Sequence, residues 1–271
     1  MRINHNLNAI NAWRNLGHTN TMIGKSLEKL SSGLRINRAG DDAAGLAISE
    51  KMRAQIKGYD MATKNAQDGI SLIQTAEGAL TEVHSMLQRM REISVQAAND
   101  TNNTEDRNAL KKEITQLQTE INRIGSTTKF NGKTLFTSTA AFSLQIGPDK
   151  DTNLVLKVSS QSITTTKLGI GSINIASNTS SQIAISNIDG AIKQISSLRA
   201  QFGAYQNRLE HTVNNLSVSS ENLTAAESRI RDVDMAKEMM KFTKQQILLQ
   251  SSNAMLAQAN QAPQQVLSLL R

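Results

Sequence analysis

The chain has 271 residues, enough for one or two domains with a core, and it is 38% hydrophobic but only 3% aromatic. It contains no cysteine, which excludes disulfides and thiolate metal sites. The formal net charge of +7 raises nucleic acid as a partner, but acidic residues are interleaved with the basic ones and the longest basic run is Lys111-Lys112. We therefore expect no nucleic-acid binding, and a core of aliphatic side chains that suits packing of helix on helix.

Two further absences bear on location. No apolar stretch is long enough to span a bilayer, so we expect no membrane insertion. Residues 1–16 lack the apolar segment of an ordinary secretory signal. Composition by itself therefore favours a cytoplasmic protein.

The first strong helical pattern runs from residue 73 to residue 90. Its apolar positions alternate spacings of three and four, as in a coiled-coil seam: Ile73, Ala76, Leu80, Val83, Leu87 and Met90. A polar break at Asn99–Asn103 precedes a second such pattern between Leu110 and Ile124, for which Thr104 is the expected N-cap. Since no glycine or proline lies between Gly78 and Gly125, both helices can be long.

The middle of the chain has a different composition. Residues 129–175 are rich in Thr, Ser, Val and Ile, which predicts a small β region. Asn131-Gly132 is a hairpin-turn signal, and short strands are expected at Phe142–Ile146 and Leu154–Val158. The polar stretch Ser177–Gln182 is interpreted as a loop.

A third helical pattern follows, with apolar residues seven apart. They are Ile188, Ile195, Phe202, Leu209, Leu216, Leu223 and Ile230. Half of the seam positions between them are polar, so one partner helix would seal this seam poorly, and we expect packing against helices of the N-terminal half. The predicted fold class is mainly α: a long antiparallel helical bundle or coiled coil of N- and C-terminal segments with a small central β-hairpin region.

No catalytic, cofactor or metal site is predicted. The four histidines form no ligand pair with spacing that suits a metal: His5, His18, His84 and His211. The carboxylate pair Asp41-Asp42 precedes Ala43-Ala44 and is typical of a helix start. A nucleophile elbow and a phosphate-binding loop are both missing from the sequence. We therefore expect a protein that is not an enzyme.

Several ungapped motifs at both ends of the chain carry a family resemblance. They are Met1–Asn6, Leu30–Asn37, Asp41–Ile48, Asn65–Ser71 and Met255–Arg271. These motifs resemble the terminal regions of bacterial flagellin, over about residues 1–136 and 185–271. The methionine-rich stretch Met235–Met240 departs from the family pattern.

The resemblance implies a structural subunit that assembles with copies of itself into the flagellar filament for motility. Residues 1–42 and 232–271 would pair as a coiled coil lining the filament core, and 43–231 would form a helical bundle with its β region at about 129–175. The large outer domains of longer flagellins have no counterpart, so the chain resembles the minimal form. The apolar residues expected in the filament core are Ile3, Leu7, Ile10, Leu27, Leu30, Leu34, Leu256, Val266, Leu267, Leu269 and Leu270.

The resemblance also implies partners and a location. Flagellins reach the extracellular flagellum by type III flagellar secretion without a cleaved signal peptide, helped by an export chaperone, a filament cap and hook-junction proteins. Gln88, Arg89, Ile93 and Glu113 match the site read by Toll-like receptor 5, and we expect Arg89 and Ile93 to share an exposed stripe. The alternative function is a hook–filament junction adaptor, which shares the terminal coiled coil.

Overall fold

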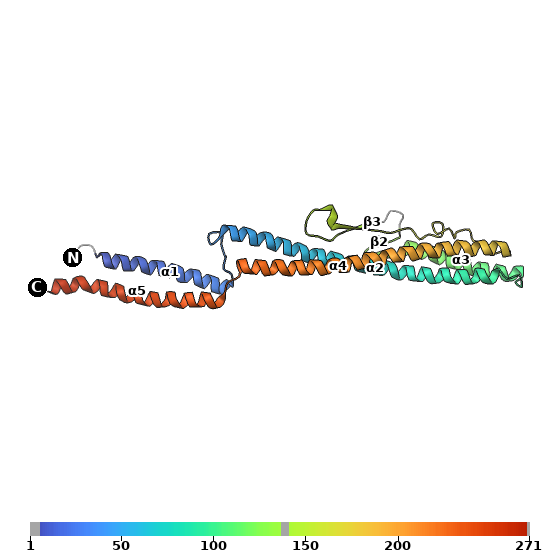
Figure 1. Cartoon of the computed structure of the whole chain (residues 1–271). Coiled ribbons are helices and arrows are strands. Elements are labelled where there is room, and N and C mark those ends of the chain that lie inside the picture. Colours follow the sequence, from blue (N-terminus) through green and yellow to red (C-terminus); the bar gives the residue numbers. More distant parts are fainter. Residues whose placement is uncertain (1–5, 137–140, 270–271) are drawn as a thin grey trace. The chain divides into compact units, whose positions relative to one another are not determined.

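A computed structural model describes residues 6–136 and 141–269, with backbone only beyond Gln261. Within these residues five α-helices carry two small antiparallel sheets (Figure 1). The helices are α1 (Leu7–Ser32), α2 (Ala43–Ala97), α3 (Thr104–Thr127), α4 (Asn178–Arg231) and α5 (Met235–Leu269). The strands are β1 (Lys129–Phe130), β2 (Lys133–Thr134), β3 (Ala141–Gln145) and β4 (Val155–Ser159). The predicted mainly α class with central hairpins is confirmed.

The chain forms two compact units. Unit 1 comprises Met1–Ile56 with Glu221–Arg271, and unit 2 comprises Lys57–Ser220. Helices α2 and α4 each contribute to both units. The division at 42/43 and 231/232 that the resemblance implies falls at the ends of these two helices, and as a division between layers of a filament it stays a prediction.

The core of unit 2 lies along α2 and α4. The predicted seam from Ile73 to Met90 is inaccessible to solvent, and so are the heptad positions of α4 from Ile188 to Leu216. Arg91 Nε lies 2.7 Å from Asp189 Oδ1, and an Arg199–Glu77 pair joins the same helices at 3.6 Å, which sets α2 and α4 antiparallel. The periodicity therefore predicted the buried faces of both helices correctly.

The cap of α3 differs by one residue from the prediction. The Asn103 side chain accepts a hydrogen bond from the Asp106 backbone N–H at 2.8 Å, and the Asp106 carboxylate accepts one from the Asn103 N–H at 3.1 Å. This reciprocal capping box makes Asn103 the N-cap, with Thr104 the first helical residue. Both residue types can cap a helix, and the acid three residues beyond Asn103 decides between them.

The β region follows the predicted turn chemistry. Asn131 and Gly132 have φ of 47° and 78°, the left-handed values that a two-residue hairpin turn between β1 and β2 requires. Strands β3 and β4 pair antiparallel, each within one residue of its predicted bounds. Residues 160–177, which carry no regular strand, pack their isoleucines inward. These are Ile163, Ile170, Ile173 and Ile175.

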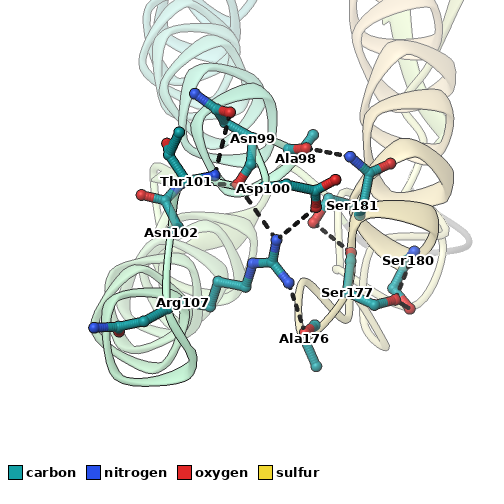
Figure 2. Close-up of polar contacts among 12 residues, drawn as sticks. Ala98, Asn99, Asp100, Thr101, Asn102, Arg107, Ala176, Ser177, Ser180 and Ser181 are labelled. Atoms are coloured by element: carbon teal, nitrogen blue, oxygen red, sulfur yellow. Dashed lines mark hydrogen bonds and ion pairs between the residues drawn. The ribbon is translucent and has the colours of Figure 1, made fainter.

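At one corner of unit 2 the Arg107 guanidinium joins two segments, which the Asn178 amide also links by donating to the Ala98 carbonyl. Figure 2 shows Arg107, from the first turn of α3, reaching the loop before it and the segment that leads into α4. Arg107 donates to the carbonyl oxygens of Asn99 at 3.3 Å and Ala176 at 3.2 Å, and pairs with the Asp100 carboxylate at 3.3 Å. Two chain segments far apart in sequence are thereby held together.

The prediction of a loop over Ser177–Gln182 was wrong, because α4 already begins at Asn178. The Ser177 hydroxyl accepts a hydrogen bond from the Ser180 backbone N–H at 3.2 Å. The polar residues therefore form the cap and first turn of the helix, where Ser, Thr and Asn are favoured.

Candidate assembly surface

Helices α1 and α5 lie side by side and antiparallel in unit 1 (Figure 1). At one end the Asn6 side-chain amide donates to the Ala259 carbonyl at 2.7 Å. At the other end Leu34 and Asp232 form an antiparallel bridge, flanked by a hydrogen bond from the Val233 N–H to the Gly33 carbonyl at 3.0 Å. The terminal segments are thus held in one register at both ends.

The seam between the two helices is poor in large apolar side chains. In α1 it consists of Ala9, Ala12, Leu16, Thr19, Ile23, Ser26 and Leu30. In α5 it consists of Glu238, Phe242, Gln245, Leu249, Ser252, Leu256 and Ala259. Among the side chains described in α1 and α5, only Ser26 and Glu238 are buried, and both are polar. The large apolar side chains of the described seam, such as Leu16, Phe242 and Leu249, are therefore only half-buried within the chain.

A polar contact lies at the end of that seam where α1 finishes and α5 begins. Ser26 Oγ lies 2.7 Å from Glu238 Oε1 and 3.2 Å from Gln245 Oε1, and Lys241 Nζ donates to Glu238 Oε2 at 3.0 Å. Burial raises the pKa of Glu238, but the hydrogen bonds from Ser26 and Lys241 outweigh it, so the pKa is lowered overall. The carboxylate is charged at neutral pH, and such a buried charged contact specifies register better than it stabilises a fold.

Each helix of the pair presents a second row of residues, spaced three and four apart, to solvent; in α1 this row flanks the seam. The outward stripe of α1 consists of Ile10, Trp13, Gly17, Asn20, Gly24, Leu27 and Ser31. The outward stripe of α5 consists of Ala236, Met240, Thr243, Ile247, Gln250, Ala254, Ala257 and Gln261. Every one of these residues is exposed and none is charged. Rows with this spacing are the surfaces on which further helices pack.

The expected filament-core residues separate into two groups. Leu7, Ile10 and Leu27 are exposed, whereas three others are half-buried inside unit 1: Leu30, Leu34 and Leu256. Ile3 and Leu270 lie outside the described residues, and so do the side chains of Val266, Leu267 and Leu269. Sequence reasoning missed Trp13 and Met240, although both stand at heptad spacing from expected or apolar neighbours.

The segment matched to the immune receptor lies on α2 and α3. Arg89 Nε donates to Glu113 Oε1 at 2.9 Å and Arg89 Nη1 to Glu92 Oε2 at 3.2 Å, while Gln88 lies exposed beside them. These two hydrogen bonds raise the pKa of the Arg89 guanidinium. The expected exposure of Ile93 was wrong, since this side chain is 0% exposed in the core of unit 2. Because α3 and α4 both pack against α2, apolar positions beside its seam are covered as well.

Two kinds of feature are missing from the described parts of the chain. Neither range, 6–136 or 141–269, brings three His, Asp or Glu side chains together in a way that would hold a metal ion. No helix within these ranges combines the length and apolar character needed to cross a membrane.

Fold and surface together define a structural protein, built of long helices whose terminal pair exposes rows for further helices. Models of the bacterial flagellin N-terminal and C-terminal helical regions match residues 3–141 and 185–270. A flagellin of Halalkalibacterium halodurans is 58% identical and one of Bacillus subtilis 51% identical, each over 100% of both chains. The crystal structure of Bacillus cereus flagellin is similar with a TM-score of 0.50 and 34% identity, covering 60% of this chain and 94% of that one. The chain belongs to the bacterial flagellin family. It is a structural subunit of the flagellar filament, outside the cell, and not an enzyme.

Proposed function

We propose that this chain polymerises by burying the outward stripes of α1 and α5 between copies in the filament core. The observation that carries the proposal is that this helix pair buries polar side chains and exposes apolar ones. Its buried side chains, within the described residues, are Ser26 and Glu238, while Trp13 and Ile247 are exposed. Burial of apolar surface is the main favourable term in helix association, and the exposed apolar side chains of this pair gain that term only from neighbouring copies.

The stripes also favour an open polymer over a closed ring. They lie on two different helices and have different side chains, so one copy's α5 stripe is suited to meet another copy's α1 stripe. A contact between unlike patches of identical subunits is heterologous, and it produces a helical filament when the rotation does not close. Since the pair is completed only by neighbours, its ordering is coupled to addition at a filament end.

Seeded assembly tests this proposal. Purified chain is mixed with short filament fragments and imaged by negative-stain electron microscopy, beside a variant that lacks residues 232–271. We expect long filaments from the full chain and none from the shortened one, which retains all of unit 2 as its control. Rings or monomers from the full chain would contradict the proposal and support the alternative, a hook–filament junction adaptor.

The partners follow from the same surface. We infer that an export chaperone covers the exposed apolar residues of α5 before type III secretion, and that a filament cap and hook-junction proteins receive the chain outside the cell. Helix α5 offers Met240, Ile247 and Met255 for such a cover. An intact peptide beginning at Met1 or Arg2, found by mass spectrometry of secreted chain, would establish export without a cleaved signal.

We further propose that the free monomer is recognised by Toll-like receptor 5 through Gln88, Arg89 and Glu113. These residues lie at the surface, with Arg89 and Glu113 joined at 2.9 Å. We expect Arg89→Ala with Glu113→Ala to lower the signal at least tenfold in a receptor reporter cell, since losing a charge contact at an interface costs about 2 kcal/mol or more. The matched control is Glu120→Ala with Arg123→Ala, another exposed ion pair on α3. Equal signals from the two double variants would refute recognition at this site.

A further inference from the structure

Methionine is concentrated on the exposed side of α5. Met235, Met239, Met240 and Met255 are between 47% and 68% exposed. Met240 belongs to the outward stripe of α5, and the other three precede or follow members of that stripe in sequence: Met235 and Met239 lie beside Ala236 and Met240, and Met255 lies beside Ala254. These four residues are called the α5 methionines below.

Exposed methionines are the side chains of this chain that a mild peroxide oxidises most readily. Because the sequence has no cysteine, a mild peroxide finds no thiol to oxidise and the thioethers are its preferred targets. Hydrogen peroxide transfers one oxygen atom to the methionine sulfur: the O–O bond breaks, an S=O bond forms, the sulfur loses two electrons and water leaves. The product, methionine sulfoxide, is a polar side chain with a strong hydrogen-bond acceptor in place of an apolar one.

Sulfoxide formation at these residues would affect assembly, because they lie on the surface of α5 that we propose is buried in the filament. An uncharged row suits apolar burial, and a sulfoxide buried there without a donor carries the full desolvation penalty of a polar group. We propose that the α5 methionines are an oxidation-sensitive modification site, at which sulfoxide formation in the free chain blocks its addition to the filament. The proposal rests on the proposed burial of the outward stripes between copies. It implies that assembly in turn shields these thioethers from peroxide.

The chain contains its own reference methionines. Met90 is 0% exposed in the core of unit 2, so its thioether should resist oxidation while the fold is intact. Met61 is 54% exposed on α2 and belongs to unit 2 rather than to the α1–α5 pair, so it should oxidise as readily as the α5 methionines. A contrast between Met61 and the α5 methionines therefore separates chemical reactivity from effect on assembly.

The test combines peptide mass spectrometry with seeded growth. Full-length chain is treated with hydrogen peroxide until sulfoxide is found at the α5 methionines but not at Met90, and elongation of filament seeds is then followed. We expect elongation to slow about tenfold or more, the effect of one polar group buried without a partner. Treatment with the two methionine sulfoxide reductases, with dithiothreitol as reductant, should restore the original rate because each enzyme reduces one epimer.

Two variants locate the effect. The quadruple variant Met235→Leu, Met239→Leu, Met240→Leu and Met255→Leu should elongate equally well before and after peroxide, since leucine replaces methionine at nearly constant volume. Met61→Leu should remain as sensitive as the unaltered chain. Undiminished growth of the oxidised chain, or equal inhibition of the quadruple variant, would overturn the proposal. Failure of the untreated chain to elongate would instead refute the proposed function, so the two failures are distinguishable.

Discussion

Ile247→Lys should abolish seeded filament growth and leave the free chain folded. Ile247 is 61% exposed on the outward stripe of α5, so lysine at this position keeps its ammonium group in water as long as the chain is alone. Lysine is also a good helix former, and surface substitutions of this kind change the free energy of unfolding by about 0.5 kcal/mol or less. Within a polymer the same ammonium would be buried in an uncharged row, at a cost of several kcal/mol in every copy.

Circular dichroism of the free chain tests whether the variant stays folded, and electron microscopy of seeded reactions tests whether filament growth is lost. The control is Ile183→Lys on α4, where an isoleucine of nearly equal exposure, 59%, lies in unit 2. We expect the control to elongate normally. Normal growth of Ile247→Lys would show that the outward stripe of α5 is not part of the filament interface.

Replacing both Gly17 and Gly24 by alanine should strengthen α1 and weaken assembly. Glycine inside a helix costs about 1 kcal/mol relative to alanine, and α1 carries two of them seven residues apart on its outward stripe. No atom lies within 4 Å of a Cβ built at either position, so nothing within the chain requires glycine there. Close approach of a helix from another copy would require it, because a missing side chain lets two backbones come together.

We therefore expect opposite signs from two measurements on this double variant. The thermal unfolding midpoint of the free chain should rise or stay unchanged, while the rate of seeded elongation should fall at least several-fold, as overpacking an interface costs about 1–3 kcal/mol. Gly78→Ala supplies the control: this glycine also lies in a helix with nothing within 4 Å of its Cβ, but on α2 in unit 2. This single substitution should gain about half of the helical stability of the double variant, without a loss of growth. Undisturbed growth of the double variant would show that no helix of another copy packs closely against Gly17 and Gly24.

Periodicity alone determined much of this protein. The spacings of Ile73–Met90 and of Ile188–Leu216 predicted the buried faces of α2 and α4, and Asn131-Gly132 predicted a hairpin turn. These predictions hold because helix phase and turn conformation depend on residues only a few positions apart. The terminal motifs likewise indicated the flagellin family, since each of them is a continuous stretch of sequence.

Tertiary structure decided what local spacing leaves open. Helix α1 has apolar residues in two rows: Leu16, Ile23 and Leu30 on the seam, and Ile10, Trp13 and Leu27 on the outward stripe. Only the docking of α5 shows which row faces that helix and which faces solvent. Ile93 was expected at the surface because one seam of α2 was considered, yet this side chain belongs to the buried core cluster of unit 2. Which side of a helix is buried depends on how many helices surround it, and that number is a property of the folded chain rather than of any window of its sequence.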